Sequence, residues 1–169
     1  MLRYSTMDTP AGPFTIVVGP DDAVRASGFT ADVAELTELI HPRLHDDLQR
    51  VDDVGPAQAA VTSYFDGDLT AIDDVRVDQR TGGSFRAHAW EVMRDIKPGE
   101  PATYSGFAAL AGRPTAIRAA AAACAQNAAA LFVPCHRVVG TDGKLHGYRW
   151  GLDVKTALLE HEQGRSIAA

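Results

Sequence analysis

A change of sequence pattern at Thr81-Gly82-Gly83-Ser84 constrains the fold of this 169-residue chain more than any other feature. Before these residues, short apolar stretches alternate with turns rich in proline, glycine and aspartate, a pattern typical of β-hairpins. After them, apolar residues recur at the three- and four-residue spacing of helices. The sequence therefore predicts two domains, an α/β domain at residues 1–82 and a mainly helical domain at residues 83–169.

The first domain is expected to begin with a hairpin. Three stretches are strand candidates: residues 4–7, 14–18 and 24–29. The first two flank the turn Thr9-Pro10-Ala11-Gly12-Pro13. Helices are expected at residues 31–40 and 56–65, where apolar residues have helical spacing. Hairpins followed by helices predict a small α/β domain.

Helices dominate the second predicted domain. Three stretches are helix candidates: residues 85–96, 104–110 and 116–126. The last two are separated by the turn Ala111-Gly112-Arg113-Pro114. We expect Thr115 to cap the helix that follows and Asn127 to end it. Helix, tight turn and helix at this spacing outline a helix-turn-helix motif, which in DNA-binding proteins contacts the duplex through its second helix.

The second helix of this motif consists almost entirely of alanine. Residues 119–125 contain no asparagine, glutamine, lysine or arginine, so the helix cannot read a major groove through side-chain hydrogen bonds. Small side chains, among them Ala119 and Ala122, would let the backbone lie close to DNA, with Thr115 at the start of the helix and Arg118 projecting from it. Close packing against another helix explains the alanines equally well, and alanine is also the best helix former.

A cysteine and a histidine stand next to each other after an apolar run. Residues 128–133 predict a short buried strand. They are followed directly by Pro134-Cys135-His136-Arg137-Val138. A thiol is nucleophilic only as the thiolate, and a neighbouring imidazole can accept its proton directly or through a water. The alternative is a buried cysteine that packs as a small apolar residue beside a core histidine.

The charge of the chain is divided unevenly between the two predicted domains. The net charge is −6, which by itself argues against nucleic-acid binding. Residues 1–82 hold 6 Lys and Arg against 15 Asp and Glu, whereas residues 83–169 hold 10 against 7. Because a phosphate backbone responds to the face nearest to it, the second domain can approach DNA. Four arginines are candidates for phosphate contacts or ordinary surface charges: Arg86, Arg94, Arg113 and Arg137.

Several other classes of protein find little support in the sequence. No apolar run approaches the roughly 20 residues that span a bilayer, and the N-terminus has no signal-like apolar segment, so we expect no membrane association and a cytoplasmic location. Two cysteines, Cys124 and Cys135, do not make a disulfide framework, and we expect Cys124 to be a buried small residue. The histidine spacing and the paired aspartates match no common metal site, so we expect neither metal nor cofactor.

Six features occur together and in this order: Tyr104, Arg118, Asn127, the Pro134–Val138 run, Tyr148 and Glu162. In this combination the chain resembles the O6-alkylguanine-DNA alkyltransferases, also called methylated-DNA–protein-cysteine methyltransferases. The resemblance is close over residues 83–169 and looser before them. The pair Arg149-Trp150 resembles the bacterial adaptive-response branch of the family. The family fold implies a ribonuclease H-like N-terminal domain and a helix-turn-helix in the C-terminal domain.

The resemblance implies a set of catalytic residues. Cys135 would be the alkyl acceptor. His136, acting through a water, and Glu162 behind it would form a relay that ionises the thiol, since a nearby imidazolium lowers a thiol pKa. Glu160 is a competing choice for the carboxylate. Asn127 would hold the turn that leads to the acceptor.

The resemblance also implies how the base is held. Tyr104 would donate a hydrogen bond to guanine N3 and so ease the departure of the base. The carbonyls of Cys135 and Val138 would accept the exocyclic amine. Tyr148 would form a wall of the pocket, and the backbone amide of Arg149 would face O6.

The implied reaction is the repair of DNA by direct reversal of damage. One methyl or alkyl group would move from O6-alkylguanine, or from O4-alkylthymine, to Cys135, once per molecule. The partner would be double-stranded DNA with the damaged base flipped out, and Arg118 would fill the gap that the base leaves. Trp150 is expected to narrow the pocket and to favour methyl over benzyl adducts. We expect a monomer that can cluster on DNA. Two alternatives are a non-catalytic lesion binder and a helix-turn-helix regulator that senses alkylation.

Overall fold

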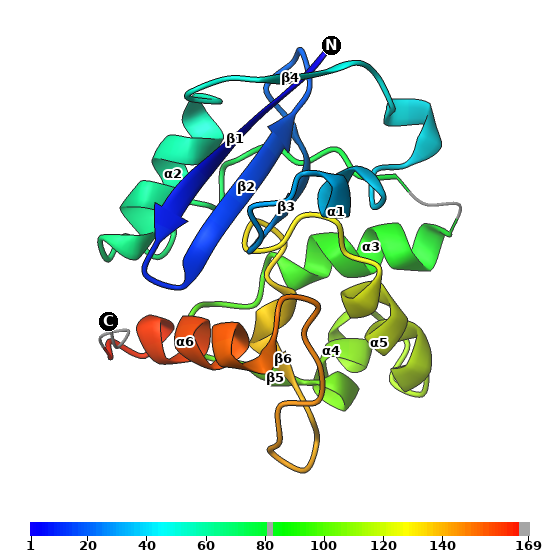
Figure 1. The fold of residues 1–169 in the computed structure, drawn as a ribbon. Coiled ribbons are helices and arrows are strands. Elements are labelled where there is room, and N and C mark those ends of the chain that lie inside the picture. The colour runs from blue at the N-terminus through cyan, green and yellow to red at the C-terminus, as the bar shows by residue number, and fades with distance from the viewer. Residues whose placement is uncertain (81–82, 166–169) are drawn as a thin grey trace. The chain divides into compact units, whose positions relative to one another are not determined.

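The computed structural model describes residues 1–80 and 83–165, so Thr81 and Gly82 of the predicted boundary lie outside the described residues (Figure 1). The described residues form two compact units. The first contains Met1–Arg80 together with Ala128–Phe132, and the second contains residues 83–127 and 133–165. Five residues of the second predicted domain therefore belong to the first compact unit.

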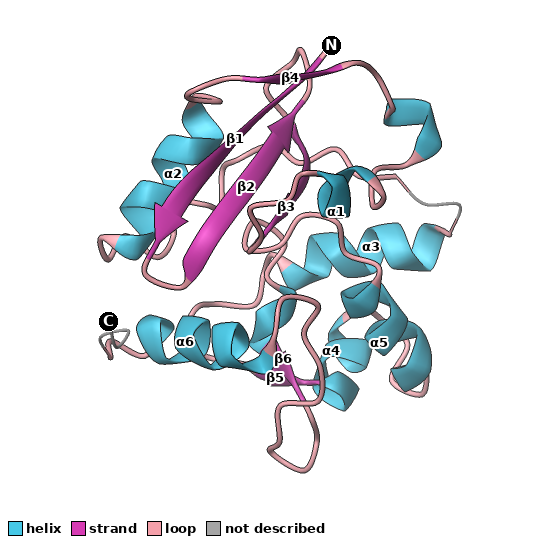
Figure 2. Cartoon of the chain, viewed as in Figure 1, coloured by secondary structure: helices cyan, strands magenta, loops and turns pink. Residues whose placement is uncertain are grey.

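A four-stranded sheet forms the centre of the first unit (Figure 2). Its strands are β1 (Leu2–Thr9), β2 (Gly12–Val18), β3 (Val24–Gly28) and β4 (Leu48–Arg50), in the order β3-β2-β1-β4. Strands β1 and β2 form the expected antiparallel hairpin, and β3 pairs antiparallel with β2. The short strand β4, which the sequence pattern did not indicate, lies parallel to β1. Every residue of β2 from Phe14 to Val18 is buried, so this strand is covered on both faces and lacks the usual alternation of buried and exposed residues.

Two helices belong to this unit, and one of them is shorter than expected. Helix α2 (Pro56–Phe65) has the predicted bounds and packs against β1, whereas α1 (Ala34–Thr37) is a single turn instead of the predicted ten residues. After α1 the amides of Leu39 and Ile40 bond three residues back, as in a 3-10 helix. His41 is extended because it precedes a proline, which disfavours the helical conformation, and a short 3-10 helix, η1 (Pro42–Leu44), follows.

The apolar run at residues 128–133 is buried, but the prediction of a strand there is wrong. Only Ala129 forms a bridge, to Ser27, and the hydroxyl of Ser27 donates to the carbonyl of Ala130 at 2.8 Å. Leu131 has φ +74°, a left-handed conformation that a regular strand cannot contain. Phe132 packs against Phe14, with ring centroids 6.3 Å apart. The run is thus a buried turn that completes the core of the first unit.

The second unit is mainly helical, as predicted. Its helices are α3 (Ser84–Met93), α4 (Tyr104–Leu110), α5 (Ile117–Ala125) and α6 (Leu152–Glu162). Two short strands, β5 (Ala102–Thr103) and β6 (Val138–Val139), pair in parallel. The 3-10 helix η2 (Cys135–Arg137) immediately precedes β6. None of the helices within residues 1–80 and 83–165 is long and apolar enough to cross a membrane.

The caps of α4 and α5 differ from each other, and the cap expected for α5 is not found. Helix α4 begins and ends where predicted, and the hydroxyl of Thr103 caps it by accepting the amide of Gly106 at 3.0 Å. Thr115 does not cap α5, because the N-cap position is Ala116 and no side chain bonds the free amides there. Helix α5 is held by a contact with α3, because the indole of Trp90 on α3 donates to the carbonyl of Ala123 at 2.9 Å.

Candidate active site

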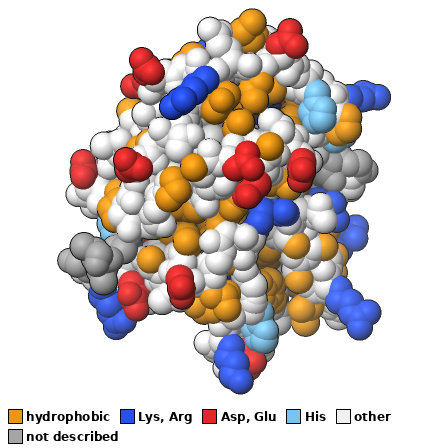
Figure 3. Space-filling view, viewed as in Figure 1, with side chains coloured by type: hydrophobic (Ala, Val, Ile, Leu, Met, Phe, Trp, Pro, Cys, Tyr) orange, Lys and Arg blue, Asp and Glu red, His pale blue; other side chains and the backbone are white. Residues whose placement is uncertain are grey.

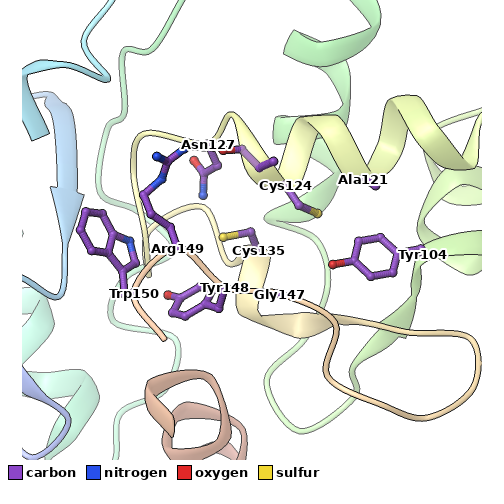
Figure 4. A pocket seen from close by; sticks show the side chains of 10 residues that line it. Tyr104, Ala121, Cys124, Asn127, Cys135, Gly147, Tyr148, Arg149 and Trp150 are labelled. Atoms are coloured by element: carbon purple, nitrogen blue, oxygen red, sulfur yellow. Dashed lines mark hydrogen bonds between the residues drawn. The ribbon is translucent and has the colours of Figure 1, made fainter. Parts of the chain in front are cut away.

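A pocket of about 330 Å³ lies in the second unit, and its size is in the range of small-molecule sites (Figure 4). Ten residues line it: Tyr104, Ala121, Cys124, Ala125, Asn127, Cys135, Gly147, Tyr148, Arg149 and Trp150. Six of these were predicted as site residues from the sequence: Tyr104, Asn127, Cys135, Tyr148, Arg149 and Trp150. The pocket therefore gathers residues from α4, α5, η2 and the loop before α6.

Cys135 is placed on the pocket wall by a tight turn. Its amide donates to the carbonyl of Val133 at 2.8 Å, and the side-chain amide of Asn127 donates to the same carbonyl at 2.8 Å. Asn127 is itself buried, so this bond fixes the path of the chain between α5 and η2. Asn127 thus bonds the segment that leads to Cys135, and its part in holding an alkyl acceptor stays a prediction.

His136, Arg137 and Glu162 form a buried cluster in the second unit. The Nε2 atom of His136 lies 2.7 Å from Oε2 of Glu162, and all three side chains are almost fully buried. Arg137 donates to both oxygens of the same carboxylate, at 2.8 and 3.0 Å, and to the carbonyl of Ile96 at 2.8 Å. Glu162 and not Glu160 is therefore the partner of His136. Arg137 is not the surface charge or phosphate contact that the sequence suggested.

The protonation of this cluster follows from burial and from its hydrogen bonds. Burial would raise the pKa of Glu162, but the contacts with His136 and Arg137 outweigh it and hold that pKa well below its usual range. Burial lowers the pKa of His136, although the Glu162 carboxylate opposes the shift. A neutral His136 must donate from Nε2 to the carboxylate, which leaves Nδ1 as the acceptor. Nδ1 has no hydrogen-bond partner among the described residues, so its lone pair can take a proton.

The environment of the Cys135 thiol affects its pKa in opposite directions. Burial raises the pKa of Cys135, and the hydrogen bond with Asn127 and the charge of Lys155 oppose this shift without reversing it. The resting pair is thus a neutral thiol beside a neutral imidazole. In such a pair a thiolate forms when the thiol proton moves to an acceptor, and His136 is the residue predicted for that role.

Comparison with known proteins gives this arrangement its context. Residues 84–164 match the protein family described as 6-O-methylguanine DNA methyltransferase, DNA binding domain. Over 172 aligned residues the chain is 38% identical to a methylated-DNA–protein-cysteine methyltransferase of Mycobacterium bovis, with 99% of this chain and 96% of the relative covered. The chain belongs to the methylated-DNA–protein-cysteine methyltransferase family.

Solved structures agree with this membership of the methyltransferase family. The crystal structure of Mycobacterium tuberculosis OGT in complex with DNA matches with a TM-score of 0.80 and 34% identity, covering 97% of this chain and 94% of that one. The predicted α/β fold is therefore confirmed. Over 97 residues the chain is also 44% identical to the Escherichia coli bifunctional transcriptional activator/DNA repair enzyme Ada, covering 57% of this chain and 26% of Ada. That match does not separate the adaptive-response branch from the rest of the family, so the branch stays a prediction.

The two tyrosines of this methyltransferase pocket are held in the protonated form. Burial, with smaller contributions from Cys124 and Cys135, raises the pKa of Tyr104 to about 12. Burial also raises the pKa of Tyr148 well above its ordinary value, and its hydroxyl has no hydrogen-bond partner among the described residues. Both side chains can therefore act as hydrogen-bond donors to a bound base at neutral pH.

Lys155 is a residue that the sequence analysis missed. Its side chain is 1% exposed, and Nζ donates to the carbonyls of Val138 at 2.8 Å and Gly147 at 3.1 Å. Burial lowers the pKa of Lys155, while the nearby thiols of Cys135 and Cys124 favour its charged form. This lysine therefore joins two segments, that of Val138, a predicted base-binding residue, and that of Gly147, which lines the pocket. The sequence offered one indication that Lys155 faces the site. It lies two helical turns before Glu162 and therefore on the same face of α6.

Cys124 also differs from its expected place. It is half-buried on the wall of the pocket rather than inside the core, and both cysteines are free thiols. Burial, together with the nearby Cys135, raises the pKa of Cys124 far above its ordinary value, so this second thiol stays protonated.

Helix α5 presents three different surfaces. Ala120 and Ala123 are buried and Ala121 lines the pocket, whereas Arg118 and Ala119 are exposed. The other two predicted contacts with DNA, Thr115 and Ala122, are exposed and half-buried respectively. On the face drawn in Figure 3, basic side chains lie near α3 and α5 and at the tip of the loop that follows β6. The predicted DNA-contacting residues thus lie on or beside a helix that also forms part of the pocket wall.

A metal centre finds no support in the described part of the chain. Within residues 1–80 and 83–165 no group of three or more histidine, cysteine, aspartate or glutamate side chains is arranged to hold a metal ion. The chemistry available at this site is that of a thiol, an imidazole–carboxylate pair, a buried lysine and two neutral phenols.

Proposed function

We propose that this chain repairs alkylated DNA by moving a methyl or alkyl group from O6 of guanine to Sγ of Cys135. The observation that carries this proposal is that the thiol of Cys135 lies on the wall of a pocket of about 330 Å³. The next residue, His136, bonds Glu162 through Nε2 and keeps Nδ1 without a hydrogen-bond partner among the described residues. The name of the M. bovis relative supports the same reaction.

The proposed reaction is a single displacement. The thiol proton passes to Nδ1 of His136, directly or through a water, and Glu162 stabilises the imidazolium that forms. Sγ then attacks the alkyl carbon, an S–C bond forms, and the C–O6 bond breaks with its electron pair moving to guanine. Tyr104 donates a hydrogen bond to N3 and stabilises the negative charge on the departing base. Guanine finally takes up the proton released by the thiol. Because a thioether is not reversed by ordinary reductants, each molecule reacts once.

Access to O6 requires the base to leave the stack. Extruding a nucleotide costs a few kcal/mol, and less when alkylation has already weakened the pair. We propose that the exposed face of α5 lies against the DNA backbone or minor groove and that Arg118 occupies the space of the extruded base. The similarity to M. tuberculosis OGT, which was crystallised in complex with DNA, supports this choice of partner.

The remaining assignments belong to the same proposal. Residues 83–169 would act as the DNA-binding and alkyl-acceptor domain and residues 1–82 as a domain that braces it. We propose a monomer that can cluster on DNA, and a cytoplasmic location. O6-alkylguanine is the proposed substrate, with O4-alkylthymine as a second candidate.

The direct test is one incubation. Radiolabelled O6-methylguanine DNA is mixed with the wild type and with Cys135→Ala, and the label bound to protein is counted. Up to one methyl per chain should move to the wild type, none to the variant, and tandem mass spectrometry should assign it to Cys135 rather than Cys124. DNA binding without label transfer would identify a lesion binder or a regulator instead and would reject the proposed reaction.

A further inference from the structure

The tripeptide Tyr148-Arg149-Trp150 forms one wall of the pocket between two glycines. Gly151, at its end, has φ +104°, and the amide of Gly151 donates to the carbonyl of Tyr148 at 3.1 Å, which closes the tripeptide into a turn. Gly147, at its start, also lines the pocket. Because glycines on both sides leave the backbone conformationally free, the position of this wall depends on contacts made from outside the turn.

The side chain of Arg149 makes one such contact, with the end of α5. Its Nη2 donates to the carbonyl of Ala125 at 2.5 Å, and Ala125 is the last residue of the helix (Figure 4). The last carbonyls of a helix have no partner within the helix and carry its negative dipole end, so a guanidinium there is favourable. The contact therefore joins the pocket wall to the helix proposed to lie on DNA.

A second contact holds the other end of the turn. The ammonium of Lys155 on α6 donates to the carbonyl of Gly147. The wall is thus fastened from α6 at its start and from α5 at its centre. Of the two cations Lys155 is buried, whereas Arg149 is exposed, so Arg149 is the contact that a bound duplex can reach.

We propose that the side chain of Arg149 is a positioning residue that fixes the pocket wall to the carboxyl end of α5 and thereby sets the position of Tyr148 and of the Arg149 amide relative to Cys135. This inference rests on the proposed function. It differs from the base contact expected of the Arg149 backbone, because it assigns a task to the guanidinium. A rival explanation is a simple phosphate contact, since four of the five N–H groups of a guanidinium are not needed for the bond to Ala125.

The experiment compares Arg149→Gln, Arg149→Lys and the wild type on two substrates. One is DNA with a single O6-methylguanine, and the other is the nucleoside O6-methyl-2′-deoxyguanosine, which has no phosphate. Arg76→Gln is the matched control, since Arg76 is an exposed arginine of the first unit that also donates to a backbone carbonyl, that of Asp21. Amide hydrogen exchange of residues 147–151 and thermal unfolding are measured on the same samples.

Arg149→Gln should lower the second-order rate constant about tenfold on both substrates, because a hydrogen bond to a charged group is lost. Arg149→Lys should recover part of the rate, since an ammonium can donate to the same carbonyl. Exchange at residues 147–151 should rise in Arg149→Gln and stay unchanged in Arg76→Gln. A loss confined to DNA, with the nucleoside rate and the exchange as in the wild type, would show a phosphate contact and overturn the inference. Absence of transfer by the wild type would instead reject the proposed function.

Discussion

Glu162 is buried between the histidine and the arginine of η2, and its carboxylate accepts hydrogen bonds from both. The guanidinium of Arg137 is almost fully buried and keeps this carboxylate ionised. A permanently charged Glu162 cannot store the thiol proton, so its part in the relay is to orient His136 and stabilise the imidazolium. His136 is then the only member of the cluster whose charge changes during the proposed reaction.

Replacing Glu162 by glutamine should therefore destabilise the protein in a pH-dependent way. The change leaves Arg137 buried without its ionic partner, a cost of about 3 kcal/mol. Because the folded-state pKa of Glu162 is lowered, the unfolded chain binds more protons below the ordinary glutamate pKa of about 4.3. The contribution of Glu162 is thus complete above that pH and is lost as the pH falls towards the folded-state pKa.

Urea unfolding of the wild type and Glu162→Gln at pH 7 and near pH 3.5 checks this prediction. The difference in the free energy of unfolding should be large at pH 7 and should shrink in acid. A difference that is the same at both pH values would mean that the carboxylate charge does not contribute. Glu160→Gln is the matched control, since Glu160 lies on the same helix and does not bond His136, and it should stay within about 0.5 kcal/mol of the wild type.

Trp150 lines the pocket, which places a large ring where a bulky adduct would need space. We predict that Trp150→Gly raises the ratio of benzyl to methyl transfer by roughly tenfold or more, since small steric differences in a pocket change selectivity by that order. The measurement is the rate of transfer from DNA carrying either adduct. An unchanged ratio would show that the indole does not restrict the pocket.

At the scale of elements, the start of α4 matters because Tyr104 is its first residue. The hydroxyl of Thr103 caps this helix, whereas Thr115, which the sequence suggested as the cap of α5, is exposed and caps nothing. Thr103→Ala should therefore lower the free energy of unfolding by about 1 kcal/mol. Thr115→Ala should leave it within about 0.5 kcal/mol of the wild type. Thermal or urea unfolding of both variants measures these free energies. An equal decrease in the two variants would contradict the assignment of the caps.

The ends of the helices and strands also show where a local sequence pattern is sufficient to predict the bounds of an element. Helices α2 and α4 have the predicted bounds, because an initial proline or threonine cap marks their starts in the sequence itself. Helix α1 is shorter because the amides of Leu39 and Ile40 bond three residues back, so the α-helical pattern does not continue to residue 40. The run at residues 128–133 has the burial of a core strand, yet its shape depends on bonds to Ser27, a residue about a hundred positions away.

At the scale of the whole molecule, the chain does not divide cleanly at one boundary. Ala128–Phe132 belongs to the compact unit of Met1–Arg80, although residues on both sides of it belong to the other unit. The segment that leads to Cys135 therefore depends on residues of the first unit for its burial.

An isolated fragment of residues 83–169 should accordingly fold poorly. It would expose the apolar run at residues 128–132, so we expect it to bind a hydrophobic dye and to unfold with a broadened, low midpoint. In the full chain, Phe132→Ala should lower the free energy of unfolding by about 3 kcal/mol through the lost packing with Phe14. Calorimetry and dye fluorescence provide the measurements. A fragment that unfolds cooperatively at the midpoint of the full chain would show that this half is self-sufficient.

The sequence by itself determined the hairpin and most of the helices and predicted Cys135 as the acceptor, because turns, helix periodicity and the run from Pro134 to Val138 are local signals. Tertiary structure alone decided that Lys155 and Arg137 are buried, that burial raises the pKa of the Cys135 thiol and that Arg149 reaches the end of α5. The physical reason is that a charged side chain is buried only when a partner compensates its lost hydration, and here that partner is distant in sequence, since the pairing of Arg137 with Glu162 spans 25 residues.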